Sequence, residues 1–167
     1  MLAFLWVAVV VLVVIALFAI LFTGRYPRGI FDFNLGVLRW SWRVGYYSYS
    51  VLGTDKYPPF SLGNADYPAR IELEYPERLS RGLVLVKWIL AIPHFLVVGV
   101  FQGGVGPRSG SGLNGIIVLF AAIALLFTGR YPNSLYNLNM GMNRWTARVA
   151  VCALLMRDEY PPFRLDP

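Results

Sequence analysis

His94 is the only histidine of the chain, and it follows Pro93 inside an apolar stretch from 84 to 101. Lys87 lies about two helical turns earlier. Ionisable side chains at membrane depth commonly belong to ion or proton pathways, so Lys87 and His94 form one candidate polar site. The alternative is structural: a helix bends at Pro93, and the imidazole binds a backbone carbonyl that the proline frees. The apolar stretches contain no acidic residue to complete a proton relay, which favours the structural interpretation.

Two arginine pairs, Arg39/Arg43 and Arg144/Arg148, are each spaced four residues apart. On a helix, each pair projects from one face and has the spacing to bind a phosphate group. The alternative is ion pairing inside the protein with one of three aspartates, namely Asp32, Asp55 and Asp158. The predicted set that binds lipid or a protein partner comprises Arg25, Arg39, Trp40, Arg43, Arg130, Arg144, Trp145 and Arg148.

No motif of a known catalytic machinery is present: the sequence has no nucleophile elbow, phosphate-binding loop or metalloprotease helix. Gly110, Gly112 and Gly115 match the letters of a dinucleotide fingerprint, but no predicted strand precedes them, so we interpret 102–112 as an exterior loop. Cys152 is the only cysteine, and no Cys/His group has metal-ligand spacing. We therefore expect no metal, no cofactor and no enzymatic activity.

The composition indicates a membrane protein. Hydrophobic residues make up 57% of the chain and charged residues 14%, whereas soluble domains have about 45–50% and 25%. Residues 1–22 carry no charge and are long enough to cross a bilayer. A signal peptide is the alternative there, but it would carry a basic region before the apolar run. Two further spans are predicted at 79–101 and 113–127, giving about three transmembrane helices.

The net charge of +6 has two interpretations. Clustered basic residues are typical of nucleic-acid binding, but their position beside apolar spans favours anionic membrane lipids. With three spans, nearly all Lys and Arg residues fall on one side, and only Arg108 lies in the opposite loop. The positive-inside rule then predicts a multi-pass protein of the bacterial inner membrane, with the N-terminus outside and the C-terminus in the cytoplasm.

The chain repeats itself. Phe22-Thr23-Gly24-Arg25-Tyr26-Pro27 recurs 105 residues later as Phe127-Thr128-Gly129-Arg130-Tyr131-Pro132, and Arg39-Trp40-x-x-Arg43-Val44 recurs in the same register. After a slip of two residues, Asp55, Tyr57-Pro58-Pro59-Phe60 and Leu62 match Asp158, Tyr160-Pro161-Pro162-Phe163 and Leu165. We predict a partial first repeat at 1–62 and a complete second repeat at 63–167. The first repeat has no counterpart of 67–101, so an upstream half-repeat is either absent from this sequence or was never part of the protein.

Because a complete repeat would cross the membrane twice, the copies are expected to share one orientation, related by an axis along the membrane normal. Residues 29–52 and their counterpart after Pro132 each place apolar residues on one helical stripe and arginines on another. This pattern predicts two interfacial amphipathic helices. The fold class is therefore all-α and integral to the membrane, with tandem parallel repeats.

Two non-helical segments are also predicted. The double prolines at 58–59 and 161–162 favour extended tails, which either fasten to the protein itself or dock a partner. Residues 68–75 alternate polar and apolar side chains, which predicts one short cytoplasmic strand.

These motifs together carry a family resemblance. They are Leu85-Val86-Lys87-Trp88, Ala91-Ile92-Pro93-His94, the doubled Phe-Thr-Gly-Arg-Tyr-Pro, Arg-Trp-x-x-Arg-Val and Tyr-Pro-Pro-Phe. The chain resembles a bacterial family, common in actinobacteria, that is known only as a membrane domain of unknown function. The resemblance implies tandem membrane repeats and supplies no activity, substrate or catalytic residue.

Three functional hypotheses follow. The first is a non-catalytic membrane subunit or scaffold that organises anionic lipid or a larger membrane complex, with other subunits or further copies of itself as partners. The second is a small oligomeric transporter or channel that uses the broken helix at Pro93 and His94. The third, an enzyme acting on lipid headgroups, is the weakest, because no general base is evident.

Overall fold

A computed structural model describes residues 2–48, 50–103 and 112–165 of the chain. Over these residues the regular secondary structure is all α-helical, which confirms the predicted all-α class. The helices are α1 (Leu2–Thr23), α2 (Arg28–Tyr47), α3 (Arg81–Leu90), α4 (Ile92–Gln102), α5 (Leu113–Thr128) and α6 (Asn133–Ala153). Most of the predicted exterior loop, 104–111, lies outside the described residues.

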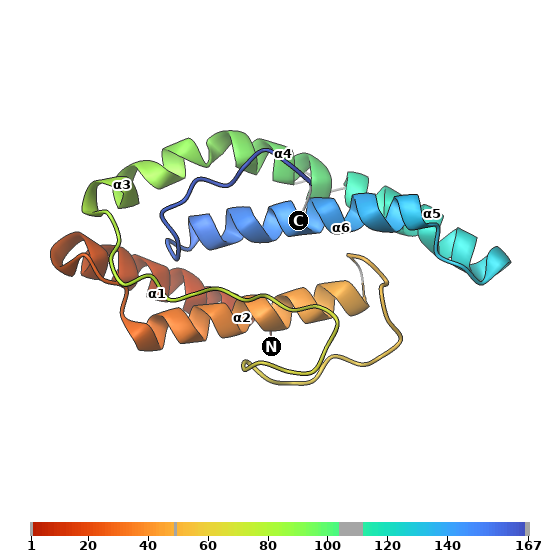
Figure 1. The fold of residues 1–167 in the computed structure, drawn as a ribbon, viewed down its shortest axis with the longest axis horizontal. Helices are drawn as coiled ribbons and strands as arrows, with labels where there is room; N and C mark the ends of the chain where they lie inside the picture. The colour runs from red at the N-terminus through yellow and green to blue at the C-terminus, as the bar shows by residue number, and fades with distance from the viewer. Residues whose placement is uncertain (1, 49, 104–111, 166–167) are drawn as a thin grey trace.

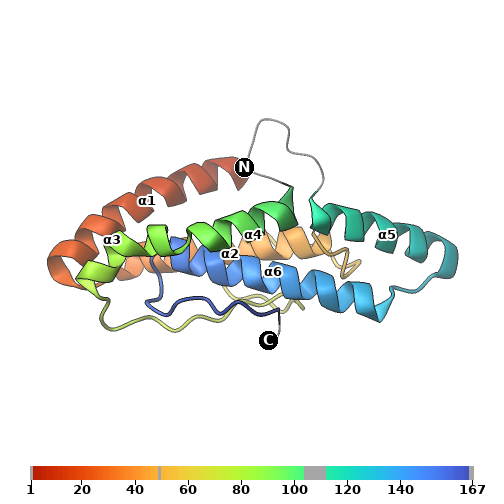
Figure 2. The same ribbon diagram turned by 90° about the horizontal axis from the view of Figure 1, so that it is seen from above.

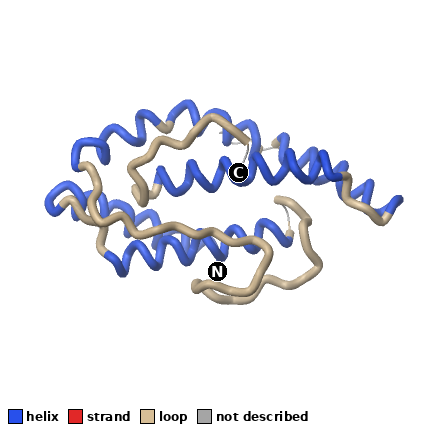
Figure 3. The backbone as a smooth tube through the Cα atoms, in the orientation of Figure 1, coloured by secondary structure: helices blue, strands red, loops and turns tan. Residues whose placement is uncertain are grey.

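The helices form two pairs joined by a bent third element. Helix α1 packs against α2, and α5 packs against α6, while α3 contacts α1 and α4 contacts α5 and α6. Helices α2 and α6 run in opposite directions (Figure 1). Seen from above, α1, α3, α4 and α5 lie toward one side, and the long connections lie toward the other (Figure 2). These connections, between α2 and α3 and after α6, are the two long loops in Figure 3.

Among the described helices, α1 alone is long and apolar enough to cross a membrane unaided, and 22% of its apolar window is buried. An apolar helix at this position is compatible with a membrane span or with a signal sequence. The predicted span at 79–101 is not one straight helix, because α3 and α4 meet at an angle of 45° around Ala91. Pro93 explains the break, since it has no N–H to donate and its ring clashes with the carbonyl four residues earlier. Helix α5 is apolar but has only 16 residues.

The predicted strand at 68–75 is wrong. These residues are extended but form no ladder with any described segment. Their backbone groups bond side chains instead: Arg39 Nε donates to the Ile71 carbonyl over 2.9 Å. Alternation of side chains predicts an extended backbone, but a strand also requires a neighbouring strand edge. The helical surfaces around this segment provide side-chain donors rather than an edge.

The repeated Phe-Thr-Gly-Arg-Tyr-Pro motif forms the same turn twice. Gly24 and Gly129 end α1 and α5 in the left-handed conformation, with φ of 70° and 65°, which glycine adopts without strain. Pro27 and Pro132 then precede the first turns of α2 and α6, where the missing N–H costs nothing. The motif is therefore a tight reversal that folds each amphipathic helix back along its apolar partner.

The main hydrophobic core lies between the two halves. It contains buried side chains from α1 and α2, including Ile20 and Phe31, and is covered by Val84 of α3. Leu155 and Met156, which follow α6, complete it. The first helix pair is therefore stabilised by residues from the second half of the chain.

Candidate functional site

The extended segment after each amphipathic helix carries the Tyr-Pro-Pro-Phe motif, at 57–60 in the first repeat and 160–163 in the second. We call this segment the tail, and it lies back against the helix that it follows. An added Cβ at Gly36 would lie 2.8 Å from Leu62 Cβ, and one at Gly141 would lie 3.0 Å from Leu165 Cβ. Both glycines thus allow a tail leucine to touch the helix backbone. Because Gly36 matches Gly141 and Leu62 matches Leu165 in the repeat, the same contact is built twice.

The second arginine of each predicted pair holds a tail. Arg43 is buried, and its Nη2 donates to the carbonyls of Ser61 and, over 3.4 Å, Gly63. Arg148 Nη2 donates in the same way to the Arg164 carbonyl. Burial, followed by the nearby charge of Arg39, lowers the pKa of Arg43 from its ordinary value. The bonds that Arg43 and Arg148 donate to their tails thus have backbone carbonyls as acceptors.

The tryptophans of the same motif lie under the tails. Trp40 and Trp145 are buried, with ring centroids 5.7 Å from Phe60 and 5.6 Å from Phe163, respectively. Sequence reasoning placed them among lipid- or partner-binding residues, and the structure places them against the tails of their own repeats. The aromatic tail therefore shields each tryptophan from the surface.

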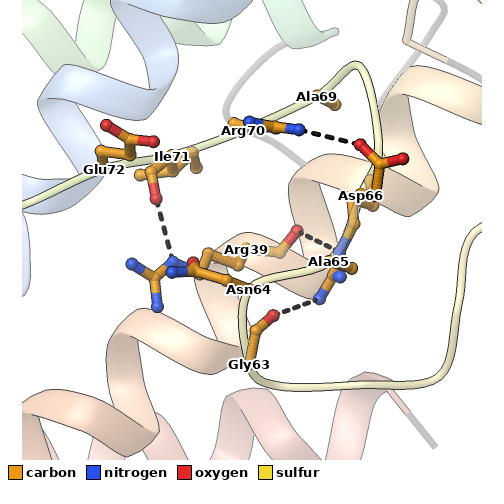
Figure 4. A pocket seen from close by; sticks show the side chains of 10 residues that line it. Arg39, Gly63, Asn64, Ala65, Asp66, Ala69, Arg70, Ile71 and Glu72 are labelled. Atoms are coloured by element: carbon orange, nitrogen blue, oxygen red, sulfur yellow. Dashed lines mark hydrogen bonds and ion pairs between the residues drawn. The ribbon is translucent and has the colours of Figure 1, made fainter.

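A cleft of about 290 Å³ lies between α2 and the loop at 63–72 (Figure 4). We call it the arginine cleft. Arg39, Arg43 and Arg70 line it together with Asp66 and Glu72, so its charged side chains sum to one positive charge. Arg70 is ion-paired to Asp66 at 2.9 Å, and Arg39 is fixed by the Ile71 carbonyl. Such a cleft is suited to a small anionic group, for which guanidinium groups are good donors.

The remaining predicted arginines are exposed. Arg25 and Arg130 lie in the two turns that end α1 and α5, and Arg144 lies on α6. The structure therefore divides the predicted set: Arg43, Trp40, Trp145 and Arg148 contact tails, whereas Arg25, Arg130 and Arg144 face outward. Arg39 is intermediate, being half-buried at the rim of the arginine cleft.

His94 is fully buried, and three aromatic rings pack against it. Its Nδ1 accepts a hydrogen bond from Trp145 Nε1 over 3.1 Å, and its ring stacks on Phe163 with centroids 4.0 Å apart. The Tyr160 ring lies 4.8 Å away, and its hydroxyl donates to the Leu90 carbonyl over 3.1 Å. The expected bond from the imidazole to a freed carbonyl is replaced by this contact with Trp145. His94 thus fastens the bent α3–α4 element to α6 and to the second tail.

Lys87 is buried, with 2% of its surface exposed, although it belongs to an apolar helix. Its Nζ lies 2.7 Å from Asp158 Oδ1 and donates to the Arg157 carbonyl over 2.9 Å. Burial alone would raise the pKa of Asp158, but hydrogen bonds from Lys87 and the Ser80 backbone N–H hold it below its ordinary value. The sequence analysis named Lys87 as a candidate polar-site residue and Asp158 as a possible partner of the arginine pairs. It did not pair the two residues with each other, although an aspartate recurs at both tails.

The two repeats are joined by a reciprocal pair of hydrogen bonds. Tyr26 of the first repeat donates to the Leu154 carbonyl over 3.1 Å, and the matching Tyr131 donates to the Val51 carbonyl over 3.0 Å. Val51 and Leu154 are themselves matched residues, each preceding a leucine with positive φ. Burial raises the pKa of Tyr26 to about 12, a shift that a bond from Asn34 partly offsets. The tyrosine of each turn therefore anchors the helix end of the other repeat.

Within the described ranges, no group of three or more His, Cys, Asp or Glu side chains is placed to hold a metal ion. Cys152 is buried, and burial raises the pKa of its thiol. The described residues therefore provide two kinds of binding. Arginine and aromatic side chains bind the tails, and the arginine cleft is suited to small anions.

These features define a helical protein with at least one candidate membrane span and two amphipathic helices that bind their own tails. The chain belongs to the family described as Domain of unknown function (DUF4389), which matches residues 1–61 and 81–164. No curated protein and no solved structure is detectably similar to it.

Proposed function

We propose that the protein is a non-catalytic subunit or scaffold of the bacterial inner membrane, which organises anionic lipid or a larger membrane complex at its cytoplasmic face. The observation that carries this proposal is the separation of two surfaces. Large apolar side chains are exposed along the apolar helices, such as Phe4 on α1, Leu96 on α4 and Phe127 on α5. The tails belong to the connections on the other side of the molecule (Figure 2). One of these connections, together with α2, lines the arginine cleft.

An exposed apolar belt of this kind is costly in water and favourable in lipid. In the proposed topology, α1, the bent α3–α4 element and α5 are the three spans, with the N-terminus outside and the C-terminus in the cytoplasm. At about 24 Å, α5 is shorter than a hydrocarbon core of about 30 Å, and local thinning or basic residues at its end would accommodate it. Arg130 directly after α5, and Arg25 after α1, are in place for that role.

The proposed ligand on the basic side is the phosphate of an anionic lipid. The turn arginines Arg25 and Arg130 lie where headgroups would be, whereas Arg43 and Arg148 keep the tails in position. Each basic residue near a lipid surface contributes about 1 kcal/mol to anionic-lipid binding. Arg130→Gln is therefore expected to weaken this binding about fivefold.

The test is purification in mild detergent followed by mass spectrometry of bound lipids and proteins, then titration with phosphatidylglycerol in mixed micelles. The control is Arg108→Gln, which removes the same charge from the predicted opposite loop. Enrichment of anionic lipid that falls in Arg130→Gln and persists in Arg108→Gln supports the proposal. A clean monomer without lipid or protein partner, or equal effects of the two substitutions, contradicts it.

A further inference from the structure

A second cleft, of about 630 Å³, lies between the end of α2, the residues that follow it, and α5. We call it the α2–α5 cleft. Its lining includes Tyr47, Leu52 and Asp55 on one side and Ala122 and Leu126 on the other. One wall therefore offers the Asp55 carboxylate and the Tyr47 ring, and the other wall is the apolar surface of α5.

The matching position in the second repeat is filled by α3. There, Lys87 binds Asp158 and the Arg157 carbonyl, and Trp88 Nε1 donates to the Ala153 carbonyl over 3.0 Å. In the register after the two-residue slip, Asp158 and Arg157 correspond to Asp55 and Thr54. In the register before the slip, Ala153 corresponds to Ser48, and all three counterparts line the α2–α5 cleft. The groups that receive α3 are thus present a second time.

The helix walls show the same correspondence. Helix α3 packs on α1, where Ile20 is fully buried and Leu21 is half-buried. The matching residues of α5 are Leu125, which is half-buried, and Leu126, which is 82% exposed. The α2–α5 cleft therefore presents to its surroundings the face that α3 covers on α1.

Trp40 supplies an independent observation. Its Nε1 is buried and has no hydrogen-bond partner among the described residues. The matching Trp145 Nε1 is satisfied by His94. A buried N–H without an acceptor is unfavourable, so an acceptor brought to Trp40 would be favoured. Tyr57 and Phe60, which match the two tail rings around His94, are 61% and 71% exposed.

We infer that the α2–α5 cleft docks an apolar, proline-bent helix of a partner polypeptide that carries a Lys-Trp pair and a histidine seven residues after the lysine. Its lysine would bind Asp55 and the Thr54 carbonyl, its tryptophan the Ser48 carbonyl, and its histidine would accept from Trp40. The inference deepens the proposed role as a membrane subunit and rests on it, because such a helix reaches the exposed face of α5 within the bilayer.

The histidine that this sequence contains is already engaged elsewhere in the fold. His94 is the only histidine of the chain, and it is held by Trp145 and stacked on Phe163. A second copy could donate its own α3–α4 element only by breaking the buried contact between Lys87 and Asp158. A partner with its own helix of this type avoids that loss.

The probe for the experiment is a labelled synthetic peptide with the sequence of residues 81–102, titrated against the full chain in lipid nanodiscs and followed by fluorescence anisotropy. Saturable binding is expected, with an affinity about tenfold weaker for Asp55→Lys and several-fold weaker for Trp40→Phe. A peptide carrying Lys87→Glu should bind Asp55→Lys better than the unmodified chain. This reversal assigns binding to Asp55 rather than to lipid partitioning or to exchange with the chain's own α3–α4.

The control variant is Asp66→Lys, which introduces the same charge change at an exposed aspartate of the arginine cleft. Equal affinities for Asp55→Lys and Asp66→Lys, or no saturable binding, would overturn the inference. A dimer of the chain alone that Asp55→Lys dissociates would also overturn it, because the occupant would then be a second copy. Anionic-lipid retention measured on the same variants separates this result from the proposed function.

Discussion

Asp158→Asn tests the buried charge pair that holds α3 against the second tail. In the unmodified protein, Asp158 Oδ1 lies 2.7 Å from Lys87 Nζ, and Asp158 Oδ2 accepts from the Ser80 N–H over 2.8 Å. The substitution removes the negative charge that faces Lys87 but keeps one oxygen that can accept from Ser80. Lys87 would be left as a charge with 2% of its surface exposed and with the Arg157 carbonyl as its remaining partner. The α3–α4 element should therefore be destabilised.

The expected magnitude follows from the exposure of the two groups. Removing one partner of a fully buried pair costs about 3–5 kcal/mol. The Asp158 side chain is 30% exposed, and this access to water lowers the expected loss in the free energy of unfolding to about 2–3 kcal/mol. For a chain of this size, the corresponding decrease in Tm is about 5–10 °C.

The assay is thermal unfolding in mild detergent, monitored by tryptophan fluorescence. Two tryptophans report on the contact between α3–α4 and α6: Trp88 of α3 bonds Ala153, and Trp145 of α6 bonds His94. Asp55→Asn is the matched control, since Asp55 is the repeat counterpart and is exposed. Its Tm should change by less than about 2 °C. Equal Tm values for Asp158→Asn and Asp55→Asn would refute the reasoning.

Three further predictions concern the repeated contacts. Gly36→Ala should destabilise the protein by about 1–3 kcal/mol, because its Cβ would meet Leu62 at 2.8 Å. Gly29→Ala is the control and should be neutral or stabilising, because an added Cβ there has no neighbour within 4 Å. Denaturant titration of both variants measures the difference. Tyr26→Phe should cost about 1–3 kcal/mol by leaving the Leu154 carbonyl and Asn34 unsatisfied, and a loss below 0.5 kcal/mol would argue against the anchoring role. Tyr26 also sets a pH limit: its pKa rises from 10.0 to about 12 on folding, so the stability it contributes is present below pH 10 and is lost as the pH rises through 12. Alkaline unfolding that is unchanged in Tyr26→Phe would contradict this.

The elements of the fold are largely readable from local patterns. Apolar length predicts α1 and α5, and the helical stripe predicts α2 and α6, because these signals depend only on neighbouring residues. The break near Pro93 also follows from local chemistry. The strand at 68–75 fails because alternation reports an extended backbone but not the presence of a strand beside it.

The contacts of the candidate site depend on how the two repeats pack, which no local pattern encodes. Lys87 lies 71 positions before Asp158, and its bond requires that α3 cross from α1 to the second tail. The sequence placed Arg43 on the correct helical face but not its partners, since backbone carbonyls leave no mark in a sequence. The recurrence of Tyr26 as Tyr131 indicated a paired role, and only the fold shows that each tyrosine binds the opposite repeat.

The proposed topology requires the turns after α1 and α5 to face the same side of the membrane. Arg25→Cys and Arg130→Cys, each made in a Cys152→Ser background, can be labelled with a membrane-impermeant maleimide in intact cells and in inverted membrane vesicles. Parallel repeats with a cytoplasmic C-terminus predict that both cysteines react in inverted vesicles and neither reacts in intact cells. Labelling of the two positions from opposite sides, or of both from outside, would contradict the proposed topology.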